Sequence, residues 1–448
     1  MAELNKINLL KLNKHFIQIK KGGVKAIIKK LRSFIYLILQ IPIYLISIPI
    51  VIIIRLIRPW FLIRWGALHS SRIGHFAKET ELYCCERDAK INIPSQKYID
   101  FFYLGKKYVC NRQLEKMWRR RIIILPTWLL ALLCNVNRFI SIFVSGGNNH
   151  EIWDHVSHGY EYSIFMRDVH NLLERFEPHL NFTDDEETKG KKILTEFGIP
   201  EGAKFVCLIV RDSGYLDRHK KYNLRDWNYH NYRDGDIDKY VLTAEELARR
   251  GYYVFRMGIN VLKPLKSSNP KVIDYANLKI RSDFMDIYLG AKCHFSISTA
   301  EGFDEIPIIF RKPIAYTGAV PIAMLETHNK ESIILTKHHI NKRNQKELTV
   351  SEIFSSNVAV SFNTNKFKKN EVELEENSPE EIRDIVIEMD ERLNGNWKET
   401  KEDLLLQKKF WSIFNNNIKK LNLEKPLHGK IKSKFGAKFL RENENWIR

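Results

Sequence analysis

The sequence is poor in cysteine, and its first 66 residues are almost without acidic side chains. The six cysteines form no C-x-x-C pair and have no metal-ligand spacing with histidine, so neither a disulfide scaffold nor a zinc framework is expected. A reduced, cytosolic compartment is the simplest explanation. No repeat of 20 to 50 residues is present, which excludes a solenoid. With 448 residues and ordinary hydrophobic and charged fractions, the chain has room for two or three globular cores.

The positive charge is concentrated at the amino terminus. The first 66 residues hold 12 Lys/Arg and one acid, Glu3, which gives +11 of the total +19. This charge flanks 22 uncharged residues, Ser33 to Ile54, a length that just spans a bilayer as a helix. Pro42 and Pro49 interrupt the run. We therefore expect residues 1–65 to attach to the cytoplasmic face of the inner membrane as a monotopic segment, with a true span and a buried helix as alternatives. Basic charge placed here favours an anionic membrane surface and argues against a nucleic-acid partner.

After residue 66, short apolar runs alternate with amphipathic helical patterns, which is typical of parallel α/β sheets. We predict a Rossmann-like amino-terminal domain over 66–180 and a second over 181–362, followed by a helical extension over 363–448. In the first block, 101–104 and 122–125 are predicted strands. In the second, capping boxes at Thr183 and Thr243 predict helices, and 204–210 and 293–298 predict strands. Ser378 and Pro379 begin a further helix.

Two strand ends in the second block carry the residues expected to bind phosphate. Ligands of open α/β sheets lie beyond the carboxyl ends of the strands. The first end begins at Arg211 and Asp212 and opens about 30 residues without apolar periodicity, a length typical of binding loops. Arg211 and Lys220 are candidate phosphate partners.

The second strand end is the turn from residue 298 to 305. Hydroxyls and a glycine there allow a diphosphate to approach the backbone, and the acids that follow can accept hydrogen bonds from ribose. The predicted donor-binding residues in this turn are Ser298, Thr299, Gly302, Asp304 and Glu305. An ordinary strand-to-helix turn is the alternative.

The general base is less clearly marked. His75 follows Gly74 at a predicted strand-to-helix turn, and histidine is the residue type that most often acts as a general base. Asp212 is the second candidate, and Glu79 and His219 compete with both. Asp234 and Asp236 match a metal-binding D-x-D motif, but no apolar strand precedes them, so we interpret them as carboxylates at a helix entry. We expect neither a metal site nor a cofactor.

Three strings resemble a family of glycosyltransferases from bacterial surface-polysaccharide clusters: residues 210–215, 251–258 and 296–302. The resemblance covers roughly 66–320 and implies a GT-B fold of two Rossmann-like domains. It further implies sugar transfer from a nucleotide-sugar to a lipid-linked or glycan acceptor, without an obligatory metal. The resemblance also implies that Arg256, at the tip of another strand, is an additional phosphate partner of the donor. The glycine-rich loop of such enzymes is reduced here to Gly74. A non-hydrolysing sugar-nucleotide epimerase and a membrane-docked nucleotide-sugar-binding protein are the alternative functions.

Overall fold

The computed structural model describes residues 42–106, 108–153, 166–218, 228–423 and 427–448, together with Ile28 and Leu31. The chain divides into two compact units that interleave along the sequence. The first comprises Met1–Ala67, Pro94–Tyr103 and Ile124–Asp154, and the second comprises Leu68–Ile93, Leu104–Ile123 and His155–Arg448. Of the predicted site residues, Lys220 lies outside the described residues, as does His219.

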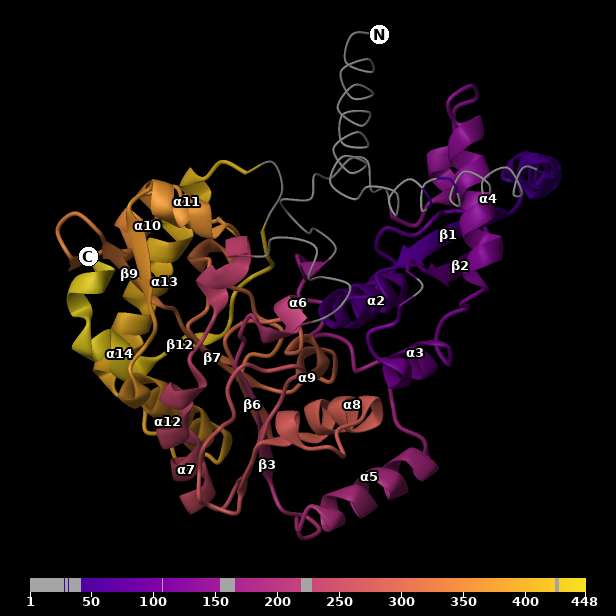
Figure 1. Cartoon of the computed structure of the whole chain (residues 1–448). Helices are drawn as coiled ribbons and strands as arrows, with labels where there is room; N and C mark the ends of the chain where they lie inside the picture. Colours follow the sequence, from indigo (N-terminus) through magenta and orange to yellow (C-terminus); the bar gives the residue numbers. More distant parts are fainter. Residues whose placement is uncertain are drawn as a thin grey trace. The chain divides into compact units, whose positions relative to one another are not determined.

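The second unit is built around a seven-stranded sheet in the order β12-β8-β7-β6-β3-β4-β5 (Figure 1). Every pair of neighbouring strands in this sheet is parallel. The strands are β3 (Phe205–Ile209), β4 (Tyr253–Arg256), β5 (Val272–Ile273), β6 (Phe295–Ser298), β7 (Ile314–Thr317), β8 (Ile333–Leu335) and β12 (Lys434–Phe435). All five residues of β3 and all four of β6 are buried, as expected for strands covered on both faces. The predicted parallel α/β architecture is therefore confirmed for this unit.

Helices cover both faces of the sheet. Helices α7 (Val241–Arg249) and α12 (Pro379–Leu393) pack together on one side of the strands, and α8 (Asp283–Lys292) and α9 (Glu305–Ile309) lie on the other (Figure 1). The remaining helices of the unit are α2 (Ile73–Asp88), α3 (Arg112–Trp118), α5 (Asp184–Glu196), α6 (Gly214–Arg218), α10 (Val350–Ser355), α11 (Thr364–Lys369), α13 (Lys401–Lys420) and α14 (Ala437–Glu442).

Helix beginnings follow the local sequence where a cap is available. The capping boxes at Thr183 and Ser378 form as predicted, with Pro379 in the first turn of α12. The predicted cap at Thr243 is wrong. The 3-10 turn η4 (Ile237–Tyr240) runs directly into α7, so that helix begins at Val241 and Thr243 is buried inside it.

The chain's last third packs on the same sheet. A three-stranded antiparallel sheet has the order β10-β9-β11, formed by Lys346–Glu347, His338–Asn341 and Val372–Glu375. Strand β12 then adds an edge strand to the main sheet beside β8. Phe410 and Phe414 of α13 and Leu440 of α14 are wholly buried in the hydrophobic cluster that also contains β3 and β6. The carboxyl-terminal helices thus cover this core.

The first unit has a much smaller sheet than predicted. Strands β1 (Leu62–Leu68) and β2 (Tyr98–Leu104) pair with each other, and single bridges join Trp65 to Glu151 and Phe102 to Ile124. The strand expected at 122–125 is reduced to that one bridge, because charged residues precede it and Pro126 follows at once. In its described residues, region 66–180 therefore lacks the sheet of a full Rossmann-like domain.

Helix α4 (Thr127–Ile140), the 3-10 turn η1 (Gly147–His150) and a helix over 42–56 complete the described part of the first unit. Ile54 of that last helix packs against a small core of Trp65, Tyr103, Leu130 and Cys134. Among the described residues, no helix combines the length and the apolar character needed to cross a membrane.

Gly190 provides a test of the packing of α5 on α8. A Cβ atom at this position would lie 2.2 to 2.5 Å from ring atoms of Tyr288. We predict that Gly190→Ala lowers the free energy of unfolding by about 1–3 kcal/mol, because the overlap outweighs the better helix propensity of alanine. Chemical denaturation measures this. Lys192→Ala on the exposed side of the same helix is the matched control and should stay within about 0.5 kcal/mol of the parent; an equal loss in both variants would contradict the packing argument.

Candidate functional site

The candidate site lies where the order of the parallel strands reverses. From β3 the chain proceeds outward to β4 and β5, and then crosses to β6 on the other side of β3. Such a switch point leaves a crevice at the carboxyl ends of the two central strands. The backbone N–H of Arg211, after β3, donates to Thr299 Oγ1, after β6, at 3.0 Å. The two strand ends selected from the sequence therefore meet.

Arginine side chains gather at this point. Arg211 is buried and forms an ion pair with Asp234, while its Nη2 has no hydrogen-bond partner. Arg256 is wholly buried, and none of its three guanidinium nitrogens has a hydrogen-bond partner. Its nearest carboxylates, those of Asp212 and Asp274, lie 3.6 and 3.7 Å away. Buried donors that lack partners are costly, so they mark a place where a ligand can supply acceptors.

Arg233 completes what we call the arginine cluster: Arg211, Arg233 and Arg256. Burial first, and then the charge of Arg233, lower the pKa of Arg211 to about 10. Burial also lowers the pKa of Arg256, against the pull of nearby acids. The half-buried Glu301 lies in the field of all three guanidinium groups, and burial nevertheless raises the pKa of its carboxyl. The cluster thus gathers three buried or partly buried cations, with the carboxylates of four acids beside them: Asp212, Asp234, Asp274 and Glu301.

The 298–305 turn is held by its own side chains. Ser298 Oγ donates to Asp304 Oδ2 at 2.9 Å and accepts from the backbone N–H of Ala300 at 3.0 Å. Asp304 also accepts from the backbone N–H of Glu301. Thr299 accepts from Arg211. Ser298, Thr299 and Asp304, predicted as donor contacts, therefore have a direct part in shaping the turn.

Glu305 has a different partner from the ribose hydroxyl that was expected. Its Oε2 lies 3.6 Å from the buried Nζ of Lys78 on α2, which also pairs with Glu326. Burial opposes the charge on Lys78, but these carboxylates outweigh it and raise the pKa of the amine. Gly74 explains how close α2 comes to the turn: a Cβ there would lie 2.9 Å from the carbonyl oxygen of Gly302. A buried ion pair and a glycine contact therefore fix α2 against the turn.

Asp212 is engaged by backbone amides. Its Oδ1 accepts from Gly214 N at 2.9 Å and its Oδ2 from Leu262 N at 2.8 Å. This carboxylate therefore holds two loops together, and its role as a general base stays a prediction. Asp236 caps the 3-10 turn η4, as expected for a helix-entry carboxylate, whereas Asp234 pairs with Arg211.

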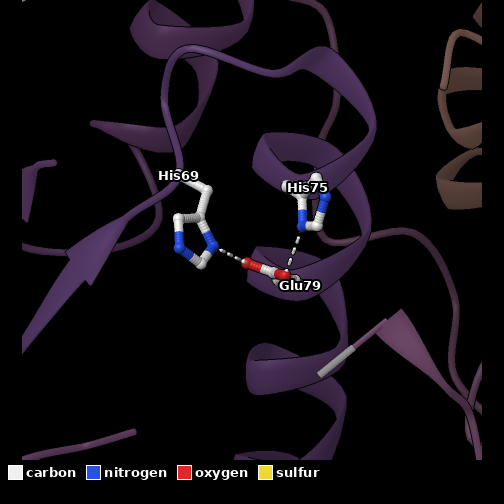
Figure 2. A group of neighbouring side chains, drawn as sticks. All are labelled: His69, His75 and Glu79. Carbon is white, nitrogen blue, oxygen red and sulfur yellow. Dashed lines mark hydrogen bonds and ion pairs between the residues drawn. The ribbon is translucent and has the colours of Figure 1, made fainter. Parts of the chain in front are cut away.

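His75 belongs to a group of three side chains, shown in Figure 2. His75 Nδ1 lies 2.7 Å from Glu79 Oε1, and His69 Nδ1 lies 2.6 Å from Glu79 Oε2. Glu79 is buried, while the two imidazoles are partly exposed. Burial opposes ionisation of Glu79, but hydrogen bonds from His69 and His75 outweigh it and lower the pKa of the carboxyl to about 2. Glu79 therefore stays ionised and orients both rings.

The same three residues bring ligand atoms within 4.8 Å of one another, so they could also hold a metal ion. A second group with this property is Glu81, Cys85 and His179. There Arg311 also pairs with Glu81, and His179 bridges Glu81 to Asp88, so these residues form an ion-pair network.

Three residues near the cluster escaped the sequence analysis. Burial, with Arg233 next, lowers the pKa of His230 to about 3, so this imidazole stays neutral among cations. The Nζ of Lys337, just beyond β8, donates to the carbonyl of Asp234, and burial lowers its pKa to about 8. Arg233 lies within the long loop already selected as a binding loop. Lys337 is separated from Arg211 by 126 positions, and no local pattern points to it.

A scan of protein-family models finds no match to this chain, and a search of curated proteins finds none either. Among solved structures, a family 9 glycosyl transferase from Veillonella parvula covers 58% of this chain and 81% of its own, at 9% identity and a TM-score of 0.34. The ADP-heptose LPS heptosyltransferase II of E. coli covers 58% and 86%, at 12% identity and a TM-score of 0.33. Both TM-scores are too low to establish a shared fold.

The ionised Glu79 carboxylate makes a measurable contribution to the free energy of unfolding. Its pKa of about 2 lies below the ordinary 4.5, so the stabilisation is fully present above pH 4.5 and is lost as the pH falls through about 2. We predict that Glu79→Gln lowers the free energy of unfolding at pH 7 by roughly 1–3 kcal/mol, because an amide cannot accept from both imidazoles.

The difference from the parent should shrink in denaturation curves recorded between pH 4.5 and 3. Glu196→Gln, on the exposed face of α5, is the control and should have no such pH-dependent effect. A constant deficit for Glu79→Gln across this range would show that packing, and not the paired charge, is responsible.

Proposed function

We propose that this chain is a glycosyltransferase that moves a sugar from a nucleotide-sugar donor to a lipid-linked or glycan acceptor. The observation that supports this most directly is the arginine cluster at the switch point of the parallel sheet. Arg256 is wholly buried there without one hydrogen bond. A diphosphate would supply the acceptors that Arg256 and Arg211 lack, and its charge would offset the cost of burying them.

The same cluster would act on the leaving group. When the bond from sugar to diphosphate breaks, negative charge builds up on the diphosphate. Fixed cations in a water-poor crevice stabilise such charge more strongly than solvent does, because they need no reorganisation. Arg211 and Arg256 have the required burial, and the turn from 298 to 305 lies beside them.

In this proposal His75 is the general base that deprotonates the acceptor hydroxyl. Its Nδ1 faces Glu79, so the bond is satisfied when Nδ1 carries the hydrogen and Nε2 keeps its lone pair. The side chain remains 24% exposed, which leaves it accessible to an acceptor. Glu79 is the positioning residue. Because both of its oxygens already accept from imidazoles, the group is complete without a metal, and we propose a metal-independent reaction.

Attachment to the cytoplasmic face of the inner membrane through residues 1–65, and a role in surface-polysaccharide synthesis, are part of the same proposal. The sequence supports the first through its +11 charge over residues 1–66 around a 22-residue apolar run. Resemblance to glycosyltransferases of polysaccharide clusters supports the second.

Nucleotide binding tests the arginine cluster. We predict that Arg211→Met and Arg256→Met each weaken the affinity for UDP, GDP, CMP or TDP, whichever binds the parent, by about 10- to 100-fold in calorimetric titration. Each variant removes a charge-assisted hydrogen bond to phosphate. Arg249→Met is the matched control, because this exposed side chain lies at the end of α7, which leads to the amino edge of the sheet. If none of the four nucleotides binds the parent chain, the transferase proposal fails.

Turnover tests the base. We predict that His75→Gln lowers kcat by about 100- to 10,000-fold while the nucleotide affinity stays within about twofold, since proton transfer and not donor binding is removed. The assay measures sugar transfer to lipid extracts and is run with and without a chelator, which should make no difference. His69→Gln is the comparison, as its ring shares the same carboxylate. Should His69→Gln be the slower variant, the base would be His69.

A further inference from the structure

The first unit exposes large apolar side chains from two segments that are far apart in the sequence. Within the helix over 42–56, Ile46, Ile53 and Leu56 are 58 to 66% exposed. In the turn after α4, Ile142 and Phe143 are both 74% exposed. Trp60 also belongs to this set, at 75%. We call these six residues the apolar surface. A monomeric soluble protein rarely shows so many large apolar side chains together.

Arg55 holds the two segments against each other. Its guanidinium donates to Asn137 Oδ1 at 2.8 Å, to Ser141 Oγ at 2.6 Å and to the carbonyl of Val144 at 3.0 Å. A Cβ atom on Gly147 would collide with both Ser141 and Arg55, so the packing here is tight. The end of the helix over 42–56 and the turn at 141–144 therefore form one continuous surface.

The charge around this surface has a single sign. Residues 42–67 and 124–150 contain four arginines and neither aspartate nor glutamate. Arg64 pairs with Asp100 and Arg138 with Glu151. Among the described residues, Arg55 and Arg58 have no carboxylate partner in an ion pair. Apolar and aromatic side chains next to cations match the acyl chains and anionic headgroups of a lipid surface.

We propose that the turn after α4 docks on an anionic phospholipid bilayer together with the helix over 42–56, with Ile142 and Phe143 entering the acyl region. The helix already has the shape this requires, since Val51 and Ile54 face inward while Ile46 and Ile53 face outward. The proposal rests on the membrane attachment proposed for residues 1–65, but it adds a second contact outside that segment. It does not depend on the nucleotide site.

A fluorescent probe at the turn tests insertion directly. Full-length Ile142→Cys and, as the matched control, Leu405→Cys are labelled with an environment-sensitive dye. Leu405 is 68% exposed on α13 in the second unit. The unsubstituted chain, whose six cysteines are buried or half-buried, sets the labelling background. On phosphatidylcholine–phosphatidylglycerol vesicles, the probe at 142 should brighten and shift to the blue, and the probe at 405 should not. An unchanged probe at 142 on protein that sediments with the vesicles would overturn the proposal.

Partition gives the second measurement. The double variant Ile142→Ser/Phe143→Ser should lower the vesicle partition coefficient about tenfold or more, because two large side chains no longer leave water. Leu404→Ser/Leu405→Ser should stay within about twofold. If residues 1–65 alone are enough to keep the double variant bound to vesicles, the fluorescence of the probe at position 142 tests whether the turn inserts. Suppose instead that the double variant has an unchanged partition coefficient but a lower particle mass in sedimentation velocity. The apolar surface then joins two copies of this chain, and the proposal is wrong. Nucleotide binding is measured on every variant with UDP, GDP, CMP and TDP. This measurement tests the transferase proposal separately from the proposed membrane contact.

Discussion

A guanidinium group buried without hydrogen bonds is the feature on which the site in the second unit depends. Moving such a charge out of water costs several kcal/mol unless partners replace the lost hydration. The carboxylates nearest to the Arg256 guanidinium lie 3.6 and 3.7 Å away. In Arg211, the nitrogen Nη2 has no hydrogen-bond partner. The parallel sheet brings these arginines together, because Arg256 ends β4 and Arg211 follows the end of β3 by two residues at the same edge of the sheet. An anion of two phosphates would relieve the cost, which is why we propose such a ligand here.

The carboxylates near the cluster offset part of its charge, and some of them are also held by other groups. Asp212 is close to Arg256, yet its oxygens accept from Gly214 and Leu262, and Asp304 is engaged within its own turn. Helix α2 is fixed to the same turn by Lys78 and by the contact of Gly74 with Gly302. His75 lies in the first turn of that helix, one residue after the glycine. The carboxylate that orients the imidazole and the turn that shapes the anion crevice therefore belong to one compact unit.

The two units carry different kinds of surface. Charge buried at a sheet edge characterises the second, whereas exposed apolar side chains bordered by arginine characterise the first. In the first unit Arg55 has the organising role, since one side chain satisfies acceptors on Asn137, Ser141 and Val144. The proposed transfer from a charged donor in water to an acceptor in lipid would use both kinds of surface.

Local sequence determined several strands of the main sheet, several helix starts and the strand ends that matter. Buried runs such as Phe205–Ile209, and capping boxes such as that at Thr183, involve residues close together in the chain, so the pattern alone reveals them. Arg211 and Thr299 were identified for the same reason, because each follows such a run. Tertiary structure decided how those residues are used. Asp212 is bound by Leu262, 50 positions away, and Glu305 by Lys78, 227 positions away. It also reduced the strand expected at 122–125 to a single bridge. Hydrogen bonds and ion pairs between such distant residues depend on distances that the whole fold sets, and a local sequence pattern does not predict those distances.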